Sequence, residues 1–263
     1  MGPRSNVLGV GISPLNLPMA VEQILLAASQ PEFCGYVTVT GVHGVMESQG
    51  DPDLKRIHNQ SFLSTPDGMP MVWMGWWNGF KHMRRVYGPD LMWELMVRTC
   101  ATGQGHYLFG GGAGVVDQLA GRLGDLHPGL CIVHQTTPPF RSLTSEEELG
   151  LVSSIRTTKP HFFWVGLSTP KQERFMHALL GNHPDLTRGW DHGLILLGVG
   201  AAFDFHAGLV PQAPSWMQKA GLEWFFRLFM EPQRLWRRYL YNNPRFIWKI
   251  FLQITGLGKQ EIS

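Results

Sequence analysis

Four segments of the chain share one order: an apolar run, a glycine-rich turn, and then a helical pattern. The β-rich run YVTVTGVHGV covers residues 36–45, and HYLFGGGAGVVDQLAGRL covers residues 106–123. HFFWVGLSTPKQERFMHALL (161–180) and GLILLGVGAAFDF (193–205) follow the same order. Strands that alternate with helices indicate βαβ units. We therefore predict an α/β fold, with a Rossmann-like, mainly parallel sheet flanked by helices.

The glycine turns predict where a ligand binds, because ligands on such sheets lie where strands end and helices begin. GGGAG at 110–114 could hold phosphates with backbone N–H groups at a helix N-terminus. No Walker A lysine follows it, and it lacks the spacing of a full GxGxxG motif. Close packing of a strand against a helix explains these glycines equally well.

Length and composition limit the class of protein. A chain of 263 residues that is 44% hydrophobic can form one large domain, or a domain with an appendage. Its three cysteines show no CxxC or zinc spacing, so we expect reduced, structural thiols. We see no signal peptide and no uncharged apolar run of ~18 residues, which predicts a cytoplasmic protein.

The C-terminal part differs from the rest in charge. We predict an α/β core at 1–212 and a helical appendage at 213–263. Residues 215–263 hold eight basic and three acidic residues, a net charge of +5, whereas the remainder holds 14 and 17, a net charge of −3. A basic tail indicates an anionic partner: a membrane surface, a nucleic acid or a phosphorylated ligand. The interleaved Trp, Phe and Tyr residues favour a membrane interface.

Three arginines of this tail are candidates for binding phosphate. Arg227, Arg234 and Arg237 lie at i, i+7 and i+10, which places them on roughly one face if the helix continues past Pro232. A solvated helix face would explain them without any function. Converging guanidinium groups also suit a diphosphate, through bidentate charge-assisted hydrogen bonds.

Two acidic motifs each have a structural and a functional explanation. Asp67 lies in the turn STPDG, where Pro, Asp and Gly are ordinary turn residues. DPD at 51–53 resembles the metal-binding Asp-x-Asp of many sugar transferases. The proline between its acids, and the residues that follow, favour the start of a helix instead. The 11 histidines form no metal-binding motif, so we predict no metal site.

Two further turns carry polar side chains. PKQE at 170–173 has the residues of a helix start, but Lys171 and Gln172 could equally bind a phosphate or a base. Asp204 follows a glycine turn at a strand end. It could cap a helix or accept hydrogen bonds from a nucleotide ring.

Taken together, several motifs in a fixed order resemble a known family, the WecG/TagA/CpsF glycosyltransferases (glycosyltransferase family 26). The resemblance runs from about residue 7 to about residue 241. The motifs that carry it are VTVTG, STPDGMPMVW, RRVYGPDLM, YLFGGGAGV, FFWVGLSTPKQE, GVGAAFDFHAG and GLEWFFRLFMEPQRLWRRY.

The resemblance implies an inverting transfer of a sugar from a UDP-sugar to a polyprenyl-diphosphate-linked saccharide, in the biosynthesis of cell-surface polysaccharides. It implies no cofactor, no obligatory metal and no nucleic-acid partner. The enzyme would work as a peripheral protein on the inner face of the cytoplasmic membrane. Because an apolar tail helix could pack against a neighbour, a homo-oligomer away from the membrane is left open.

The same resemblance implies roles for individual residues. Asp67 would be the general base, and Thr38 would lie with it among the catalytic residues. Gln172 would lie by the donor diphosphate, and Asp204 would contact the nucleotide. The residues expected to bind substrate are Thr40, Arg85, Gly110, Gly111, Gly112, Lys171, Gln172, Asp204, Arg227, Arg234 and Arg237.

The sequence departs from the family pattern at two positions. Thr40 stands where the family usually has Asn, which leaves the donor sugar open between N-acetylmannosamine, its uronic acid, glucose and glucuronic acid. Gln212 stands where an arginine is common. Two other functions remain as alternatives: a non-catalytic scaffold of a polysaccharide assembly complex, and a Rossmann-type dinucleotide oxidoreductase.

Overall fold

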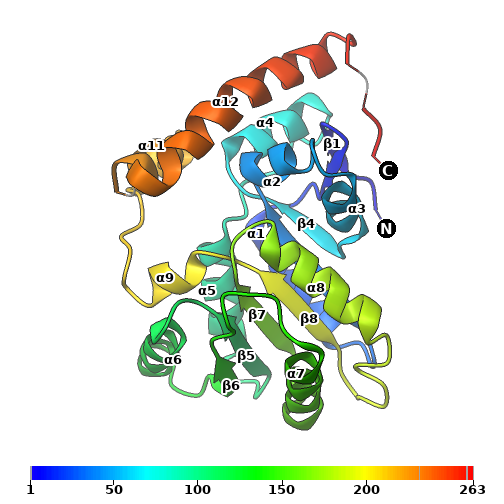
Figure 1. Cartoon of the computed structure of the whole chain (residues 1–263), viewed down its shortest axis with the longest axis vertical. Coiled ribbons are helices and arrows are strands. Elements are labelled where there is room, and N and C mark those ends of the chain that lie inside the picture. The colour runs from blue at the N-terminus through cyan, green and yellow to red at the C-terminus, as the bar shows by residue number, and fades with distance from the viewer. Residues whose placement is uncertain (1, 231, 259, 263) are drawn as a thin grey trace. The chain divides into compact units, whose positions relative to one another are not determined.

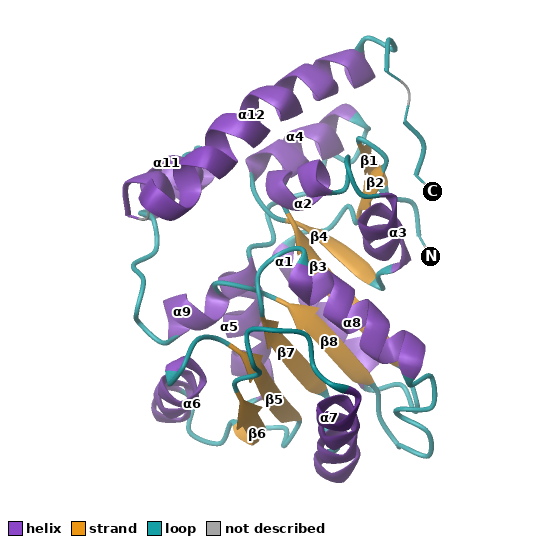
Figure 2. Cartoon of the chain, in the orientation of Figure 1, coloured by secondary structure: helices purple, strands orange, loops and turns teal. Residues whose placement is uncertain are grey.

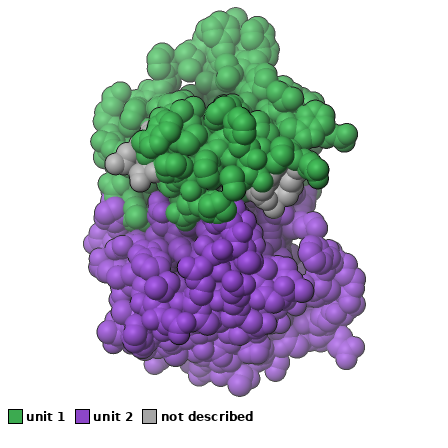
Figure 3. All heavy atoms as spheres, turned by 90° about the vertical axis from the view of Figure 1, so that its left-hand side faces the viewer, with its two compact units in different colours: residues 1–17, 38–87, 211–263 green, residues 18–37, 88–210 purple. Residues whose placement is uncertain are grey.

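The computed structural model of this chain describes residues 2–230, 232–258 and 260–262, without the side chains of residues 215, 219, 234 and 238. The chain divides into two compact units, coloured separately in Figure 3. Unit 1 comprises residues 1–17, 38–87 and 211–263, and unit 2 comprises residues 18–37 and 88–210. Residues 211–263 therefore fold together with two earlier segments, and the division between residues 212 and 213 stays a prediction.

Eight strands are present in the described residues (Figure 2). β1 and β2 form an antiparallel hairpin, and the other six form one sheet in the order β4-β3-β8-β7-β5-β6. The strands are β1 Ser5–Val7, β2 Val10–Ile12, β3 Cys34–Thr40, β4 Leu63–Pro66, β5 Gly105–Gly110, β6 Cys131–Thr136, β7 Phe162–Gly166 and β8 Leu194–Gly198.

Helices alternate with these strands along the chain (Figure 1). They are α1 Leu17–Ala28, α2 Val42–Glu47, α3 Pro52–Gln60, α4 Met69–Trp77, α5 Gly88–Thr99, α6 Val115–Leu126, α7 Ser145–Thr158, α8 Lys171–Asn182, α9 Ala202–His206, α10 Ser215–Lys219, α11 Glu223–Met230 and α12 Pro232–Ile254.

The sheet is parallel, as the alternation of strands and helices predicts. β5 pairs in parallel with β6 and β7, and β7 pairs in parallel with β8. The runs 162–165 and 194–197 are 0% exposed at every position. Side chains of a strand point alternately to the two faces of the sheet, so a strand that is apolar and buried at every position must be covered on both faces. Strands of parallel sheets usually have helices on both faces. The predicted α/β fold with flanking helices is confirmed.

The core of unit 2 contains a buried network of hydrogen-bonded side chains. His106 on β5 is fully buried; its Nδ1 accepts from the Trp164 indole N–H at 3.0 Å, and its Nε2 lies 2.8 Å from the Thr99 hydroxyl. That hydroxyl also donates to the Leu95 carbonyl, so Nε2 must be the donor to it. The ring is therefore neutral and fully hydrogen-bonded in the core.

The core of unit 1 is built by the β1–β2 hairpin together with α2, α4 and α12. Val7, Leu8 and Ile12 pack with Met83 and with Phe246 of α12, and each of these side chains is at most 6% exposed. The second half of the longest helix is thus part of this core. None of the helices in the described part of the chain has an apolar stretch long enough to cross a bilayer.

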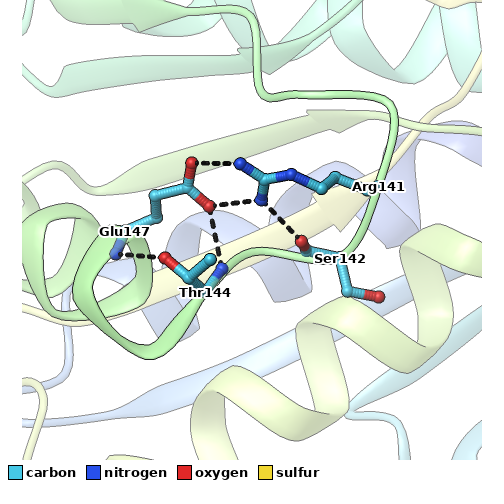
Figure 4. A network of polar contacts seen from close by, with 4 residues as sticks. All are labelled: Arg141, Ser142, Thr144 and Glu147. Carbon is cyan, nitrogen blue, oxygen red and sulfur yellow. Dashed lines mark hydrogen bonds and ion pairs between the residues drawn. The ribbon is translucent and has the colours of Figure 1, made fainter.

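Helix starts in this chain follow local sequence rules. Asp51 caps α3, because its side chain accepts from the Leu54 N–H at 3.0 Å, and Asp53 pairs with Arg56 at 3.2 Å. The helix-start interpretation of DPD is therefore confirmed. At α7, Thr144 and Glu147 form a capping box, and Arg141 makes two hydrogen bonds to the Glu147 carboxylate (Figure 4).

The three cysteines are free thiols. Burial raises the pKa of Cys34 to about 12, so this thiol stays protonated and unreactive at neutral pH. This agrees with the structural role predicted for the cysteines.

Candidate functional site

The turn that contains Asp67 joins β4 to α4 in unit 1. Asp67 follows the last residue of β4, and Gly68 adopts φ +90°, a conformation that favours glycine. The Asp67 N–H donates to the Thr40 carbonyl at 3.0 Å, which ties the turn to the end of β3. A Cβ placed on Gly41 would lie 3.0 Å from the Asp67 carbonyl oxygen and 3.4 Å from Oδ2. The half-buried carboxylate thus lies directly against a position that carries no side chain.

Arg85 lies close to this turn in the same unit. The Val86 N–H donates to the Pro66 carbonyl at 2.9 Å, so the segment around Arg85 runs beside the residue that precedes Asp67. Arg85 Nη1 donates to Gln218 Oε1 at 2.9 Å, and Nη2 forms a short ion pair with Glu223 of α11. The guanidinium carbon also lies 4.0 Å from the centroid of the Tyr87 ring.

Tyr87 is the centre of this group of charged side chains. It is 6% exposed, and burial is the main reason that the pKa of its phenol is raised. The charge of Glu223, a hydrogen bond to Glu223 and the charge of Asp67 raise the pKa of Tyr87 further, whereas Arg227 opposes them. The phenol is therefore a neutral hydrogen-bond donor at physiological pH. Three residues that the sequence analysis selected thus interact with Tyr87: Asp67 and Arg227 through their charges, and Arg85 through its contact with the ring.

Thr38 and Thr40 lie on β3, and both are fully buried. The Thr40 hydroxyl donates to Thr38 Oγ1 at 3.0 Å and accepts from the Ser64 hydroxyl at 2.9 Å. His58 Nδ1 lies 3.2 Å from the same Thr40 oxygen. These hydroxyls belong to a buried hydrogen-bond network, and their predicted contact with a sugar stays a prediction.

Two buried histidines make the stability of the fold depend on pH. Burial, assisted by Arg4, lowers the pKa of His58 to about 4; burial, assisted by His161, lowers that of His106 to about 3. In the unfolded chain both titrate near ~6.5. Below pH 6.5 the unfolded state therefore binds more protons than the folded state, and stability present above pH 6.5 is lost as the pH falls towards 4.

We expect the free energy of unfolding to fall by about 2 kcal/mol per buried histidine between pH 7 and pH 5. Urea titrations of wild type at the two pH values measure this. His58→Asn should remove about 2 kcal/mol of the total loss, whereas His82→Gln, at an exposed side chain, should leave the loss unchanged. A stability that is equal at pH 7 and pH 5 would contradict the assignment.

Unit 2 presents glycine at the carboxyl ends of three parallel strands: β5 ends at Gly110, β7 at Gly166 and β8 at Gly198. Gly110 adopts φ +139°, and a Cβ there would lie 2.6 Å from the Gly166 backbone. A Cβ on Gly166 would lie 2.6 Å from the Phe203 ring. The approach of the Gly166 backbone at Gly110, and of the Phe203 ring at Gly166, therefore requires glycine at both positions. The half-buried Gly111 and Gly112 follow Gly110 before α6.

Helix α8 begins at this edge. Lys171 is its exposed first residue, and Gln172 is 3% exposed. Gln172 Nε2 donates to the Gly198 carbonyl at 3.2 Å and to Glu173 Oε1 at 3.1 Å. Among the described residues Gln172 Oε1 has no hydrogen-bond partner, and a Cβ on Gly200 would lie 3.5 Å from it. Because a buried acceptor normally has a donor, this oxygen is a candidate contact for a ligand.

Asp204 is half-buried in the short helix α9, which follows the glycine turn after β8. Its backbone carbonyl accepts from the Leu209 N–H at 2.9 Å, which closes the turn at the end of the helix. The strand, turn and helix predicted around Asp204 are present. Its contact with a nucleotide stays a prediction.

The C-terminal arginines do not lie on one continuous helix. One helix ends at Met230 and the next begins at Pro232, and the rings of Trp224 and Tyr239 lie 5.9 Å apart. A straight helix would separate residues 15 positions apart by about 22 Å. Helix α11 therefore packs back against α12 (Figure 1), and the condition for placing the three arginines on one face, a helix that continues past Pro232, is not met.

The two arginines whose side chains are described, Arg227 and Arg237, occupy different places. Arg227 is half-buried and close enough to Tyr87 for its charge to act on the phenol. Arg237 is exposed beside the Trp236 ring, at 5.2 Å from its centroid. The side chain of Arg234 lies outside the described residues. Binding of diphosphate by this set stays a prediction.

Sequence reasoning missed Tyr87 and Glu223. Both lie inside quoted motifs, RRVYGPDLM and GLEWFFRLFMEPQRLWRRY, but neither has a local pattern that marks it as a site residue. A glutamate in the first turn of a helix is ordinary. One feature of the sequence could have indicated the pair. Glu223 is an acidic residue in a basic, aromatic tail, and Arg85 is a basic residue in a distant motif.

Comparison with known proteins gives two results. The model of the glycosyl transferase WecG/TagA/CpsF family matches residues 5–260. Over 196 residues the chain is 27% identical to an N-acetylglucosaminyldiphosphoundecaprenol N-acetyl-beta-D-mannosaminyltransferase of Bacillus subtilis (strain 168). That alignment covers 74% of this chain and 71% of the relative.

Proposed function

Because the chain belongs to the WecG/TagA/CpsF family of glycosyltransferases, we propose that it transfers a hexose from a UDP-sugar to a polyprenyl-diphosphate-linked saccharide. It is a sugar-transferring enzyme, which excludes the oxidoreductase alternative. The Bacillus relative is named for transfer of N-acetylmannosamine to N-acetylglucosaminyl-diphosphoundecaprenol. We therefore propose this donor sugar and this acceptor as the first pair to test.

The observation that carries the mechanism is the position of Asp67 beside Tyr87 and Arg85. In an inverting transfer a base removes the proton from the acceptor hydroxyl as its oxygen bonds to the anomeric carbon. The bond between that carbon and the diphosphate oxygen breaks, and UDP leaves with the bonding electrons. Asp67 is the proposed base, and Thr38 is retained with it as a proposed catalytic residue.

In unit 2 we propose that the donor nucleotide binds at the glycine-ended strands. Gly111 and Gly112, which follow the buried Gly110, offer backbone without side-chain obstruction, and α8 begins with the cation of Lys171. We keep Gly110 with them as a proposed part of this site. Gln172 Oε1, buried without a partner among the described residues, would accept from a donor hydroxyl or N–H. Asp204 is the proposed acceptor for the nucleotide base.

Charge that develops on the leaving diphosphate needs cations or N–H groups to stabilise it. Arg85 and Arg227 supply guanidinium groups in unit 1, and we keep Arg234 and Arg237 as proposed contacts of a diphosphate. We propose that the reaction needs no bound metal, so a chelator should leave transfer unchanged. Asp51 and Asp53, the acids of the DPD motif, are occupied by the cap of α3 and by Arg56.

We also propose that the enzyme binds the inner face of the cytoplasmic membrane through α10 to α12. These helices expose large aromatic side chains beside basic residues such as Arg237 and Arg245, the usual composition of an interfacial surface. The exposed aromatic residues are Trp216, Trp224, Phe225, Phe229, Trp236, Tyr241, Trp248 and Phe251. Without a membrane this surface could bind a second copy.

The proposed function is tested by a transfer assay with a synthetic polyprenyl-diphosphate N-acetylglucosamine in detergent or vesicles. A panel of UDP-sugars is offered, with and without EDTA. Transfer from one donor, equal in both conditions, is the expected result. Binding of UDP without transfer from any donor, to any lipid-linked saccharide tested, would favour the scaffold alternative.

A substitution at Gly41 tests the position of the Asp67 carboxylate without removing it. Gly41 has φ −112° and ψ −171°, which any residue can adopt, so Gly41→Ala introduces no backbone strain. Its methyl group would press on Asp67. We expect kcat to fall about tenfold, because small displacements of reacting groups are costly. Gly50→Ala, with open space around the new methyl group, should match wild type in the same steady-state assay.

A further inference from the structure

The feature that carries a further inference is Glu223, the first residue of α11. Its carboxylate contacts two side chains from the segment between α4 and α5. It pairs with Arg85 and forms a hydrogen bond with Tyr87. Glu223 and Arg85 lie 138 positions apart in the sequence, and all three residues belong to unit 1. One carboxylate therefore joins a C-terminal helix to both residues.

The burial of the contact makes it strong enough to fix geometry. The side chains of Glu223 and Arg85 are 17% and 13% exposed, and Tyr87 is 6% exposed. Charge-assisted hydrogen bonds are short and directional, and they gain strength where water is excluded. The ion pair Arg56–Asp53, whose side chains are 54% and 72% exposed, is too exposed to fix the positions of its two side chains in the same way.

The chemistry of the three groups explains why a carboxylate is needed at position 223. Arginine and the neutral phenol are both donors, and a carboxylate is the side chain that accepts from two donors without offering one of its own. An amide at this position would carry no charge and would have one accepting oxygen in place of two. The ring of Tyr87 holds the guanidinium from one side at 4.0 Å, and Gln218 holds Nη1 at 2.9 Å.

We propose that Glu223 is a positioning residue of the transfer reaction, whose carboxylate fixes Arg85 and Tyr87 next to Asp67. This inference rests on the proposed function, because it assigns Glu223 a role in that same reaction. Glu223 acts through Arg85 and Tyr87 and need not touch the substrate itself.

The kinetic test uses Glu223→Gln, Glu223→Asp and Tyr87→Phe, with Glu47→Gln, at an exposed acid of the same unit, as control. Glu223→Gln should lower kcat about 30-fold and change the KM of the donor by less than about threefold, since ground-state binding of the donor is not its task. Glu223→Asp should recover part of the loss. Glu223→Gln combined with Tyr87→Phe should be no slower than Glu223→Gln alone.

A second measurement needs no substrate. Phenylglyoxal modifies accessible arginines, and peptide mass spectrometry gives the rate at Arg85. The Arg85 side chain is 13% exposed in wild type, and Glu223→Gln should release it and increase its exposure. We therefore expect the rate of modification at Arg85 to rise about fivefold. The rate at Arg56, already exposed, should stay constant and serves as the internal standard.

Three results would overturn the inference: an unchanged kcat in folded Glu223→Gln, a faster one, or an unchanged rate of modification at Arg85. A lower melting temperature with an unchanged kcat would mean that Glu223 only stabilises the fold. If wild type transfers no sugar, the proposed function fails. The rate at Arg85 still decides separately whether Glu223 fixes that guanidinium.

Discussion

Replacing Asp67 by asparagine should lower kcat for sugar transfer by about 10³-fold, within the usual range for loss of a general base. Asparagine has nearly the same shape but cannot accept the proton of the acceptor hydroxyl at neutral pH. The turn should persist, because the contact to the Thr40 carbonyl comes from the backbone N–H of residue 67. Binding of UDP and the melting temperature should therefore stay at wild-type values.

The matched control is Asp53→Asn, which removes a carboxylate that is 72% exposed and paired only at the surface with Arg56. It should leave kcat within about twofold of wild type, since exposed ion pairs contribute little. If Asp67→Asn kept full transfer with the best donor, Asp67 would be a turn residue, and the base would have to be sought among other groups.

Phe246→Ala should be the most destabilising single change among the C-terminal helices, with a loss of about 3–5 kcal/mol in the free energy of unfolding. Phe246 is 6% exposed and packs into the core of unit 1 with Val7, Leu8 and Met83. Removing its ring leaves a cavity that the hairpin and α4 cannot readily fill. Chemical denaturation followed by tryptophan fluorescence measures the loss.

Phe229→Ala, on α11, is the control because its ring is 70% exposed. It should change the free energy of unfolding by less than about 0.5 kcal/mol. It should instead weaken co-sedimentation with vesicles that contain anionic lipid, if α11 lies in the membrane interface. A loss for Phe246→Ala as small as that expected for the control, below about 0.5 kcal/mol, would mean that the core does not depend on α12, against the packing described above.

Much of the fold follows from local sequence. The runs 162–165 and 194–197 are apolar at every position, and a glycine follows each of them, which already indicates buried parallel strands. Gly110 ends a strand and precedes a helix, as the glycine turn predicts. Pro52 with Asp51 starts a helix by local hydrogen bonding alone. These features depend on neighbours within a few residues, and such information is present in the sequence.

The sequence also determined which turn carries the candidate carboxylate, because Pro66, Asp67 and Gly68 specify a turn at a strand end wherever the rest of the chain lies. Only the tertiary structure decided what surrounds it. Arg85 meets Glu223 from 138 positions away, and α11 packs back on α12 instead of continuing it. The physical reason is the distance along the sequence over which each interaction acts. Turns and helix caps are set by backbone conformation over a few residues. The charges around Tyr87 meet only because burial of apolar side chains brings distant segments together.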